Sequence, residues 1–170
     1  MGKIVAGPAY KVVLAGTYDD GSGDYIAPSV AVASLPGVAT LVSDATATDS
    51  DKTLTTPDGY QDHVLNVFVT LTSDATVGDR QMVVEVRNLA NVIIGQARAG
   101  IVQAASLTRY YQFSPTVQDM LAFRDTDYLT VPMPMWVLPP GFQLRVWDNN
   151  AIAAAGDTMV VQVLVLREPV

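Results

Sequence analysis

Very few residues of this chain have the type and spacing that chemistry would need. There is no cysteine and a single histidine, His63, so thiol catalysis and thiolate metal sites are excluded and zinc is disfavoured. A Ser-His-Asp arrangement would have to use His63, yet the adjacent Asp62 would point to the opposite face of a strand. The only Gly-Lys pair is Gly2-Lys3, so no Walker phosphate loop is present. We predict no catalytic residue, no cofactor and no enzymatic activity.

Three aspartates on a glycine-rich turn, Asp19, Asp20 and Asp24, are weak candidates for calcium ligands, and a second, looser cluster consists of Asp44, Asp49 and Asp51. Carboxylate oxygens are ligands that calcium prefers. The spacing does not match an EF-hand loop, and the alternative interpretation is a solvated acidic loop.

Aromatic side chains could instead bind sugars without catalysis, because flat rings form platforms on β-sandwich faces. The alternative is that these rings lie in the core or at subunit contacts, where Tyr and Trp are common anchors. The candidates are Trp136, Trp147, Tyr110, Tyr111 and Tyr128.

The elements that must position these residues are predicted to be strands. The chain has 170 residues, 49% of them hydrophobic, and a net charge of −7. Its 17 acidic residues include only two glutamates, and only three lysines are present, which argues against long exposed helices. We predict an all-β fold, an antiparallel, jelly-roll-like β-sandwich. The negative charge argues against nucleic-acid binding, and no apolar run is long enough to span a membrane.

Apolar and polar residues alternate strictly in several segments from about Asp62 onward, and this pattern predicts where the strands lie. Residues 63–72 place Leu65, Val67, Val69 and Leu71 on one face, and residues 80–87 place Glu85 and Arg87 outward. Residues 87–91 predict a tight hairpin, because Asn tolerates the left-handed backbone. Residues 115–124 predict a short helix, and residues 158–166 predict a central strand covered on both faces.

The first 60 residues differ from the rest, since they lack a sustained period and are rich in Gly, Thr, Ser and Asp. We therefore expect an irregular N-terminal arm over residues 1–60 and a sandwich domain over residues 61–170. The arm is either a flexible leader with loops or a segment that orders on a neighbouring subunit. It contains apolar patches that a purely solvated tail does not need, and these favour the second interpretation. The expected interface residues, from the arm and from the proline-rich segment near residue 134, are Tyr10, Tyr18, Tyr25, Ile26, Met133, Met135 and Trp136.

Several stretches of the sandwich resemble small β-sandwich virion proteins of tailed bacteriophages. They are Asp74–Gln81, Val86–Val92, Ala104–Thr108 with the aromatic strand that follows, Leu138–Leu144, and the closing strand that ends in Arg167-Glu168. The resemblance covers about two-thirds of the chain and includes no catalytic motif.

This resemblance implies a capsid decoration or cement subunit that stabilises the phage head. Its partners would be the major capsid protein and copies of itself, with a trimer favoured because capsid lattices offer three-fold sites. It would be made in the host cytoplasm and reside on the capsid surface. The alternatives are a carbohydrate- or receptor-binding module of a tail or fibre, and a tail or connector subunit.

Overall fold

The computed structural model describes residues 18–19, 25–26, 37–46, 51–115, 127–149, 152 and 155–170. The regular elements among these residues are all β-strands, which confirms the all-β prediction. In chain order they are β1 (Tyr18–Asp19), β2 (Tyr25–Ile26), β3 (Val38–Asp44), β4 (Asp51–Thr55), β5 (Tyr60–Thr72), β6 (Met82–Arg87), β7 (Ile93–Arg98), β8 (Thr108–Ser114), β9 (Tyr128–Pro132), β10 (Val137–Leu138), β11 (Gln143–Asp148) and β12 (Thr158–Pro169).

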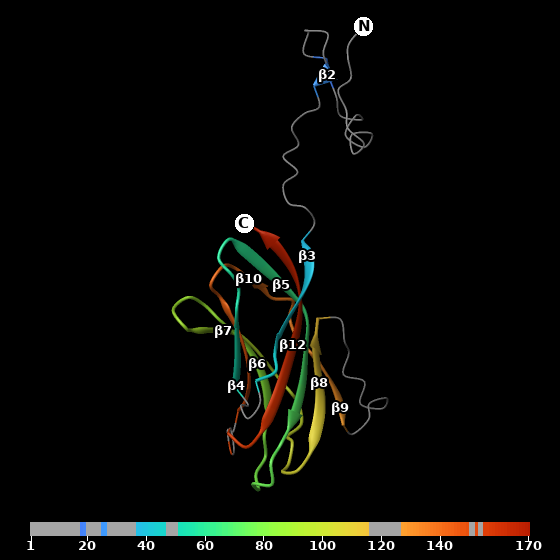
Figure 1. The fold of residues 1–170 in the computed structure, drawn as a ribbon, viewed down its shortest axis with the longest axis vertical. Helices are drawn as coiled ribbons and strands as arrows, with labels where there is room; N and C mark the ends of the chain where they lie inside the picture. The colour runs from blue at the N-terminus through green and yellow to red at the C-terminus, as the bar shows by residue number, and fades with distance from the viewer. Residues whose placement is uncertain are drawn as a thin grey trace. The chain divides into compact units, whose positions relative to one another are not determined.

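Strands β3 to β12 form a sandwich of two sheets (Figure 1). The six-stranded sheet has the order β3-β12-β5-β8-β9, with β10 added beside β5. The four-stranded sheet has the order β4-β11-β6-β7. All pairs are antiparallel except β8 with β9. Consecutive strands repeatedly change sheet, as expected for a jelly-roll-like sandwich.

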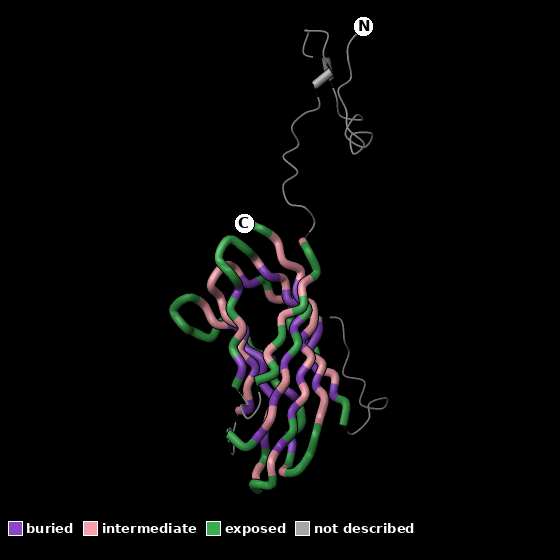
Figure 2. Tube along the Cα trace, viewed as in Figure 1, coloured by how far each residue is buried: buried purple, intermediate pink, exposed green. Residues whose placement is uncertain are grey.

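The core lies between the two sheets, where every second residue of the long strands is buried (Figure 2). On β12 the buried residues are Met159, Val161, Val163 and Val165, whereas Leu164 is 38% exposed. The prediction that this strand is covered on both faces is therefore wrong for the isolated chain. Its second face is apolar but lies on the outside of the sheet.

A β-bulge shifts the alternation of β5. Asn66 pairs with Leu164 and Val64 pairs with Val165, so Leu65 is the extra residue. Val64 is fully buried, and the Leu65 carbonyl accepts a hydrogen bond from Ser114 Oγ at 3.3 Å. The expectation that Leu65 shares a face with Val67 is wrong because a bulge reverses the facing of the residues beyond it.

The hairpin between β6 and β7 is confirmed. Asn91 has φ 62°, in the left-handed region. The Asn88 side chain accepts hydrogen bonds from the backbone amides of Ala90 and Val92, both at 3.0 Å. This turn is fixed by local side-chain chemistry, which explains why it could be predicted.

The sheets begin earlier in the chain than residue 61, where the sandwich was expected to start. β3 pairs with β12 and β4 pairs with β11, so both belong to the sandwich. The compact unit that contains the sandwich spans Pro36–Val170, and a separate unit spans Met1–Leu35. Within the latter, β1 pairs antiparallel with β2, with Tyr18 opposite Ile26. The helix expected over residues 115–124 lies, from residue 116 on, outside the described residues.

Candidate functional site

The proline-rich segment after β9 is tied by backbone hydrogen bonds to β8 and β5 of the six-stranded sheet. The Met133 amide donates to the Ser114 carbonyl at 3.2 Å, and the Val64 amide donates to the Trp136 carbonyl at 2.9 Å. Met133 is only 5% exposed and packs in the core, so its assignment as an interface residue is corrected. Met135 is 62% exposed, as an interface residue requires.

Trp136 lies between the core and strand β7. Its ring packs partly against the core. A Cβ added to Gly95 would lie 2.8 Å from Trp136 Nε1, so only glycine allows this approach. The contact brings the segment around Met135 beside β7.

The beginning of β7 carries exposed aliphatic residues next to that segment. Val92, Ile93 and Ile94 are all about half exposed, and Ile94 lies at an irregularity in the pairing of β6 with β7. We call Val92, Ile93, Ile94 and Met135 the β7 patch. Large aliphatic residues clustered on an edge strand are typical of protein interaction sites.

The outer face of the six-stranded sheet carries a row of three rings. Phe68, Tyr110 and Tyr128 come from adjacent strands β5, β8 and β9. The centroids of Phe68 and Tyr110 are 6.3 Å apart, and those of Tyr110 and Tyr128 are 4.5 Å apart with planes at 13°. Two rings this close cover each other's faces, so Tyr128, which is 53% exposed, offers the most accessible ring face of the row.

The other rings that we considered as sugar platforms are occupied within the chain. Tyr111 is fully buried, and Trp136 packs against Gly95. The Arg145 guanidinium lies 4.2 Å from the centroid of the Trp147 ring and covers one of its faces. Of the five candidates, Tyr110 and Tyr128 remain, both on the outer face of the six-stranded sheet.

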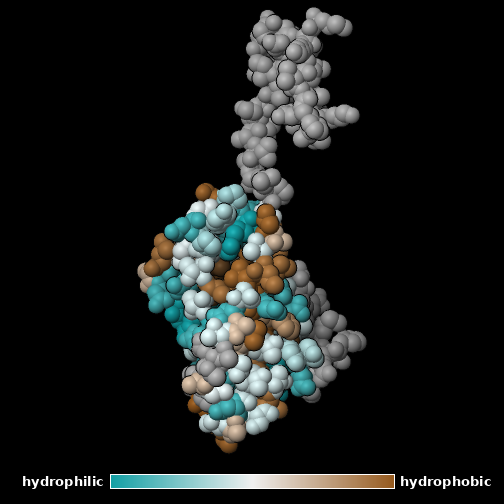
Figure 3. All heavy atoms as spheres, viewed as in Figure 1, coloured by the Kyte–Doolittle hydropathy of each residue, from teal (hydrophilic) through white to brown (hydrophobic). Residues whose placement is uncertain are grey.

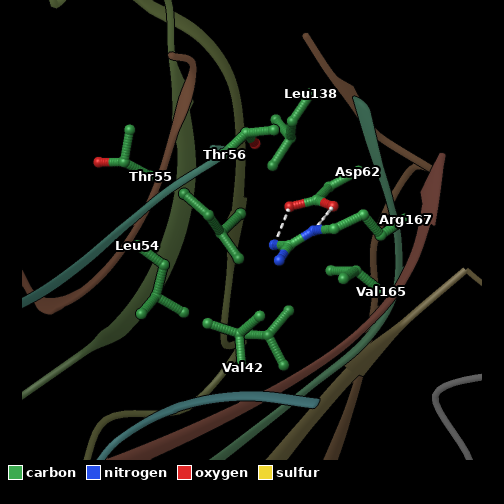
Figure 4. Close-up of a pocket in the computed structure, with 10 residues that line it drawn as sticks. Val42, Leu54, Thr55, Thr56, Asp62, Leu138, Val165 and Arg167 are labelled. Atoms are coloured by element: carbon green, nitrogen blue, oxygen red, sulfur yellow. Dashed lines mark hydrogen bonds and ion pairs between the residues drawn. The ribbon is translucent and has the colours of Figure 1, made fainter. Parts of the chain in front are cut away.

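A pocket opens between the two sheets at the edge formed by β3 and β4 (Figure 4). It encloses about 270 Å³, including the part open to solvent. Arg167 donates from Nε and Nη2 to the two carboxylate oxygens of Asp62, at 2.7 and 2.8 Å. These hydrogen bonds raise the pKa of Arg167. The remaining wall is mostly aliphatic. Figure 3 shows hydrophobic residues gathered on the side of the sandwich that faces the viewer. Both charges are satisfied by each other, so the pocket has no free group for acid–base chemistry.

The remaining sequence candidates are placed as follows. His63 Nε2 lies 3.2 Å from Glu168 Oε2 and 3.1 Å from Gln61 Nε2. Among the described residues, no group of three or more acidic or histidine side chains could hold a metal ion. Of the calcium candidates, Asp19 is described only as part of β1, and Asp20 and Asp24 lie outside the described residues. Tyr10 and the side chains of Tyr18, Tyr25 and Ile26 also lie outside them.

Sequence reasoning missed a buried charged network at one end of the sandwich. The Arg80 guanidinium and the Asp157 carboxylate are both fully buried and joined at 2.8 Å. The one available signal was the resemblance stretch Asp74–Gln81, which contains Arg80 but does not reveal its partner 77 residues away. No helix long and apolar enough to cross a membrane occurs in the described part of the chain.

Comparisons with known proteins identify no family. No family model and no curated protein matches the chain. Among solved structures, it is similar to an exo-beta-agarase (10% identity, TM-score 0.33), covering 81% of this chain and 23% of that one. It is also similar to a structure of infectious bursal disease virus Gx strain (7%, TM-score 0.30), covering 79% and 42%. It is also similar to a family 11 carbohydrate-binding module of the Clostridium thermocellum cellulase Lic26A-Cel5E (12% identity, TM-score 0.24). That match covers 79% of this chain and 88% of the module.

These likenesses do not assign a function. The chain spans less than a quarter of the length of the glycoside hydrolases that it matches. The TM-scores of these structures lie between 0.24 and 0.33. The functional argument therefore rests on the surfaces described above.

Proposed function

We propose that this chain is a non-enzymatic structural subunit of a phage virion, of the capsid decoration type. The observation that carries the proposal is the β7 patch, an exposed aliphatic surface at a sheet edge that includes Met135. An aliphatic surface at an edge is a liability in a protein that works alone, because it favours association. In a subunit that binds a repeating protein surface, the same feature is the contact.

The virion assignment itself comes from the sequence resemblance, and the surface is in accord with it. The partner we propose is the major capsid protein, together with copies of this chain. A decoration subunit needs no catalytic centre. Its net charge of −7 is also unsuited to binding nucleic acid inside the particle.

Charged substitutions in the β7 patch test this proposal. We expect Ile94→Asp and Met135→Asp each to weaken binding to purified phage heads at least about ten-fold, because each would bury a carboxylate at the contact. The measurement is co-sedimentation of the purified full chain with heads assembled without it. Val77→Asp is the matched control, because Val77 is 90% exposed on a loop and should leave binding unchanged. The proposal is contradicted if the heads bind neither the wild type nor the variants, or if they bind all of them with equal affinity.

A second candidate, carbohydrate binding without catalysis, is favoured by the ring row on the six-stranded sheet. Phe68 is flanked in register by Gln112 on β8 and Gln162 on β12, and amide side chains beside rings suit neutral sugars through hydrogen bonds and stacking. Its weakness is that Tyr110 and Tyr128 stack on each other.

Tyr128→Ala separates the two candidates. If the ring row binds a glycan, affinity electrophoresis in gels containing a neutral polysaccharide shows retardation of the wild type. Retardation should then fall at least about five-fold in the variant, because stacking on one ring contributes about 1 kcal/mol. If Tyr128→Ala binds heads as the wild type does, and the wild type is not retarded by the polysaccharide, the results support the decoration proposal and not carbohydrate binding.

A further inference from the structure

Each sheet has a strand at either end of its order, and three of these four strands carry features that discourage pairing with another chain. The edges are β3 and β9 in one sheet and β4 and β7 in the other. An edge strand presents unpaired amides and carbonyls, which proteins protect with charges, prolines or bulges. Here β4 carries Asp51 and Lys52, β9 ends in Pro132, and β7 has an irregular pairing at Ile94.

Strand β3 lacks this protection. It has seven residues, no proline and one charge, Asp44, at its end. Its register with β12 runs without interruption, and among the described residues it pairs with β12 alone. Val38 is 66% exposed and Leu41 is 62% exposed. A regular, nearly uncharged edge with exposed aliphatic residues is a template for another strand.

We propose that β3 pairs antiparallel with β3 of a second copy, about a two-fold axis at Leu41. In this register Leu41 lies opposite Leu41 of the second copy, and Ala39 lies opposite Ser43. Asp44 lies opposite Val38, so the one charge of the strand never faces its own copy. Like charges directly opposite would be destabilising, and this register avoids them.

The neighbouring strand extends the apolar contact. Leu164 of β12 pairs with Leu41 and is 38% exposed on the same outer face. The two-fold axis therefore aligns four leucines across the seam, two from each copy. This gives the exposed face of β12 a partner that the isolated chain does not supply. It also joins the two six-stranded sheets into one continuous sheet.

The symmetry follows from the strand direction. Two identical strands that pair antiparallel are related by a two-fold axis, which makes a closed, isologous dimer. A trimer, the form favoured by the resemblance alone, cannot use this contact for all three copies. The inference goes beyond the proposed function, because it concerns self-association through the sheet opposite the one that holds the β7 patch.

A cysteine cross-link tests both the contact and its register. The chain has no cysteine, so Leu41→Cys introduces a single thiol. Directly opposite residues of antiparallel strands have Cα atoms about 4.5–5.5 Å apart, within disulfide range. We expect mild oxidation of the full chain to give a cross-linked dimer on non-reducing gels. Val77→Cys, on an exposed loop, is the control that reports random collision.

Mixed variants fix the register. Ala39→Cys alone and Ser43→Cys alone should cross-link no more than the control, because identical residues would lie four positions apart, about 13 Å. An equimolar mixture, with one variant carrying an additional tag, should cross-link as the mixed pair. Cross-linking of each variant with itself would show a different register and would overturn the proposal.

Leu41→Lys supplies the reverse test, because it places two like charges opposite each other. We expect its dimer to dissociate at a protein concentration at least about ten-fold higher than the wild type in sedimentation velocity. Val77→Lys should match the wild type, and unchanged thermal unfolding would show that Leu41→Lys still folds. A wild type that is monomeric throughout, or a dimer insensitive to Leu41→Lys, overturns the proposal. If Ile94→Asp no longer binds heads but still dimerises, head binding and dimerisation use different surfaces. Failure of one proposal can then be told from failure of the other.

Discussion

Asp157→Asn is expected to lower the free energy of unfolding by about 3–5 kcal/mol, the usual cost of removing one partner from a buried ion pair. Asp157 and Arg80 are both fully buried. Arg80 donates from Nε to Asp157 Oδ2 at 2.8 Å and from Nη2 to Asp157 Oδ1 at 3.1 Å. The variant leaves the buried guanidinium charge without its fully buried carboxylate partner, and the partly exposed Asp74 carboxylate remains beside it.

The size of the effect follows from how completely Arg80 is bonded. Its remaining donors reach Asp74 Oδ1 at 2.8 Å and the carbonyls of Thr76 and Gly78 at 3.0 and 2.9 Å. The same residue exchanges two backbone hydrogen bonds with Gln103. Three connections between strands are thus held at one end of the sandwich, since Asp157 precedes β12, Arg80 precedes β6 and Gln103 precedes β8.

Denaturant unfolding of the full chain measures the change, and two variants act as controls. Asp74→Asn should lower the free energy of unfolding far less, because Asp74 is partly exposed and water replaces its contact. Arg80→Met combined with Asp157→Leu should recover much of the loss, because no unpaired charge stays buried. If Asp157→Asn lowers the free energy of unfolding as little as Asp74→Asn does, the Arg80–Asp157 ion pair does not stabilise the fold as we expect.

Sequence patterns predicted the elements whose determinants are local. The alternation of β11 and β12 and the asparagine-rich hairpin between β6 and β7 follow from neighbouring residues, so a single sequence contains the information. The bulge at Leu65 could not be predicted, because it depends on the register of β5 against a strand almost 100 residues later.

The sequence alone could not show that β3 and β4 belong to the sandwich, because the strands with which they pair lie far along the chain. Residues 38–44 and 51–55 fall within the predicted irregular arm, which is rich in Thr, Ser and Asp. They become strands by adding to β12 and β11. For the same reason, β3 as an unprotected edge could be recognised only once the strand order was known.

The candidate interface was predicted only in part. Met133 and Met135 have the same residue type and similar neighbours, yet one is 5% exposed and the other 62%. Their facing is set by backbone hydrogen bonds of the segment to Ser114 and Val64, both distant in sequence. Composition alone indicates that some surface is apolar but cannot say which side chain lies on it.

Glu85 provides the second test with a large effect. It is fully buried although its strand position faces outward, because the side chains of neighbouring strands cover it. Arg87 donates from Nε to Glu85 Oε1 at 2.7 Å, Arg145 donates from Nη1 to the same oxygen at 3.1 Å, and Gln96 donates to Oε2 at 3.2 Å. We expect Glu85→Gln to lower the free energy of unfolding at pH 7 by about 2–3 kcal/mol, because it weakens charge-assisted hydrogen bonds and directs an amide donor at arginines.

The matched control is the only other glutamate of the chain. Glu168 is partly exposed, and its contact is with His63 at 3.2 Å. Glu168→Gln should change the free energy of unfolding by no more than about 1 kcal/mol, since exposed pairs contribute little. If the two variants lower the free energy of unfolding equally, the buried contacts of Glu85 with Arg87 and Arg145 do not contribute the stability that we assign to them.

The pH dependence of the difference gives Glu85 a signature that packing effects would not produce. Burial alone would raise the pKa of Glu85, but hydrogen bonds from Arg145 and Arg87 outweigh it, so the pKa lies below its ordinary value. A carboxyl whose pKa is depressed by folding stabilises the protein above its unfolded pKa, which is about 4.3, and loses that contribution as the pH falls through its folded pKa. The gap between wild type and Glu85→Gln should therefore stay constant from pH 7 to about pH 5.5 and narrow below about pH 4.3 in denaturant unfolding series. If the difference in the free energy of unfolding between wild type and Glu85→Gln stays the same down to pH 3, the destabilisation comes from altered packing. The ionised carboxylate would then not be what stabilises the two arginines.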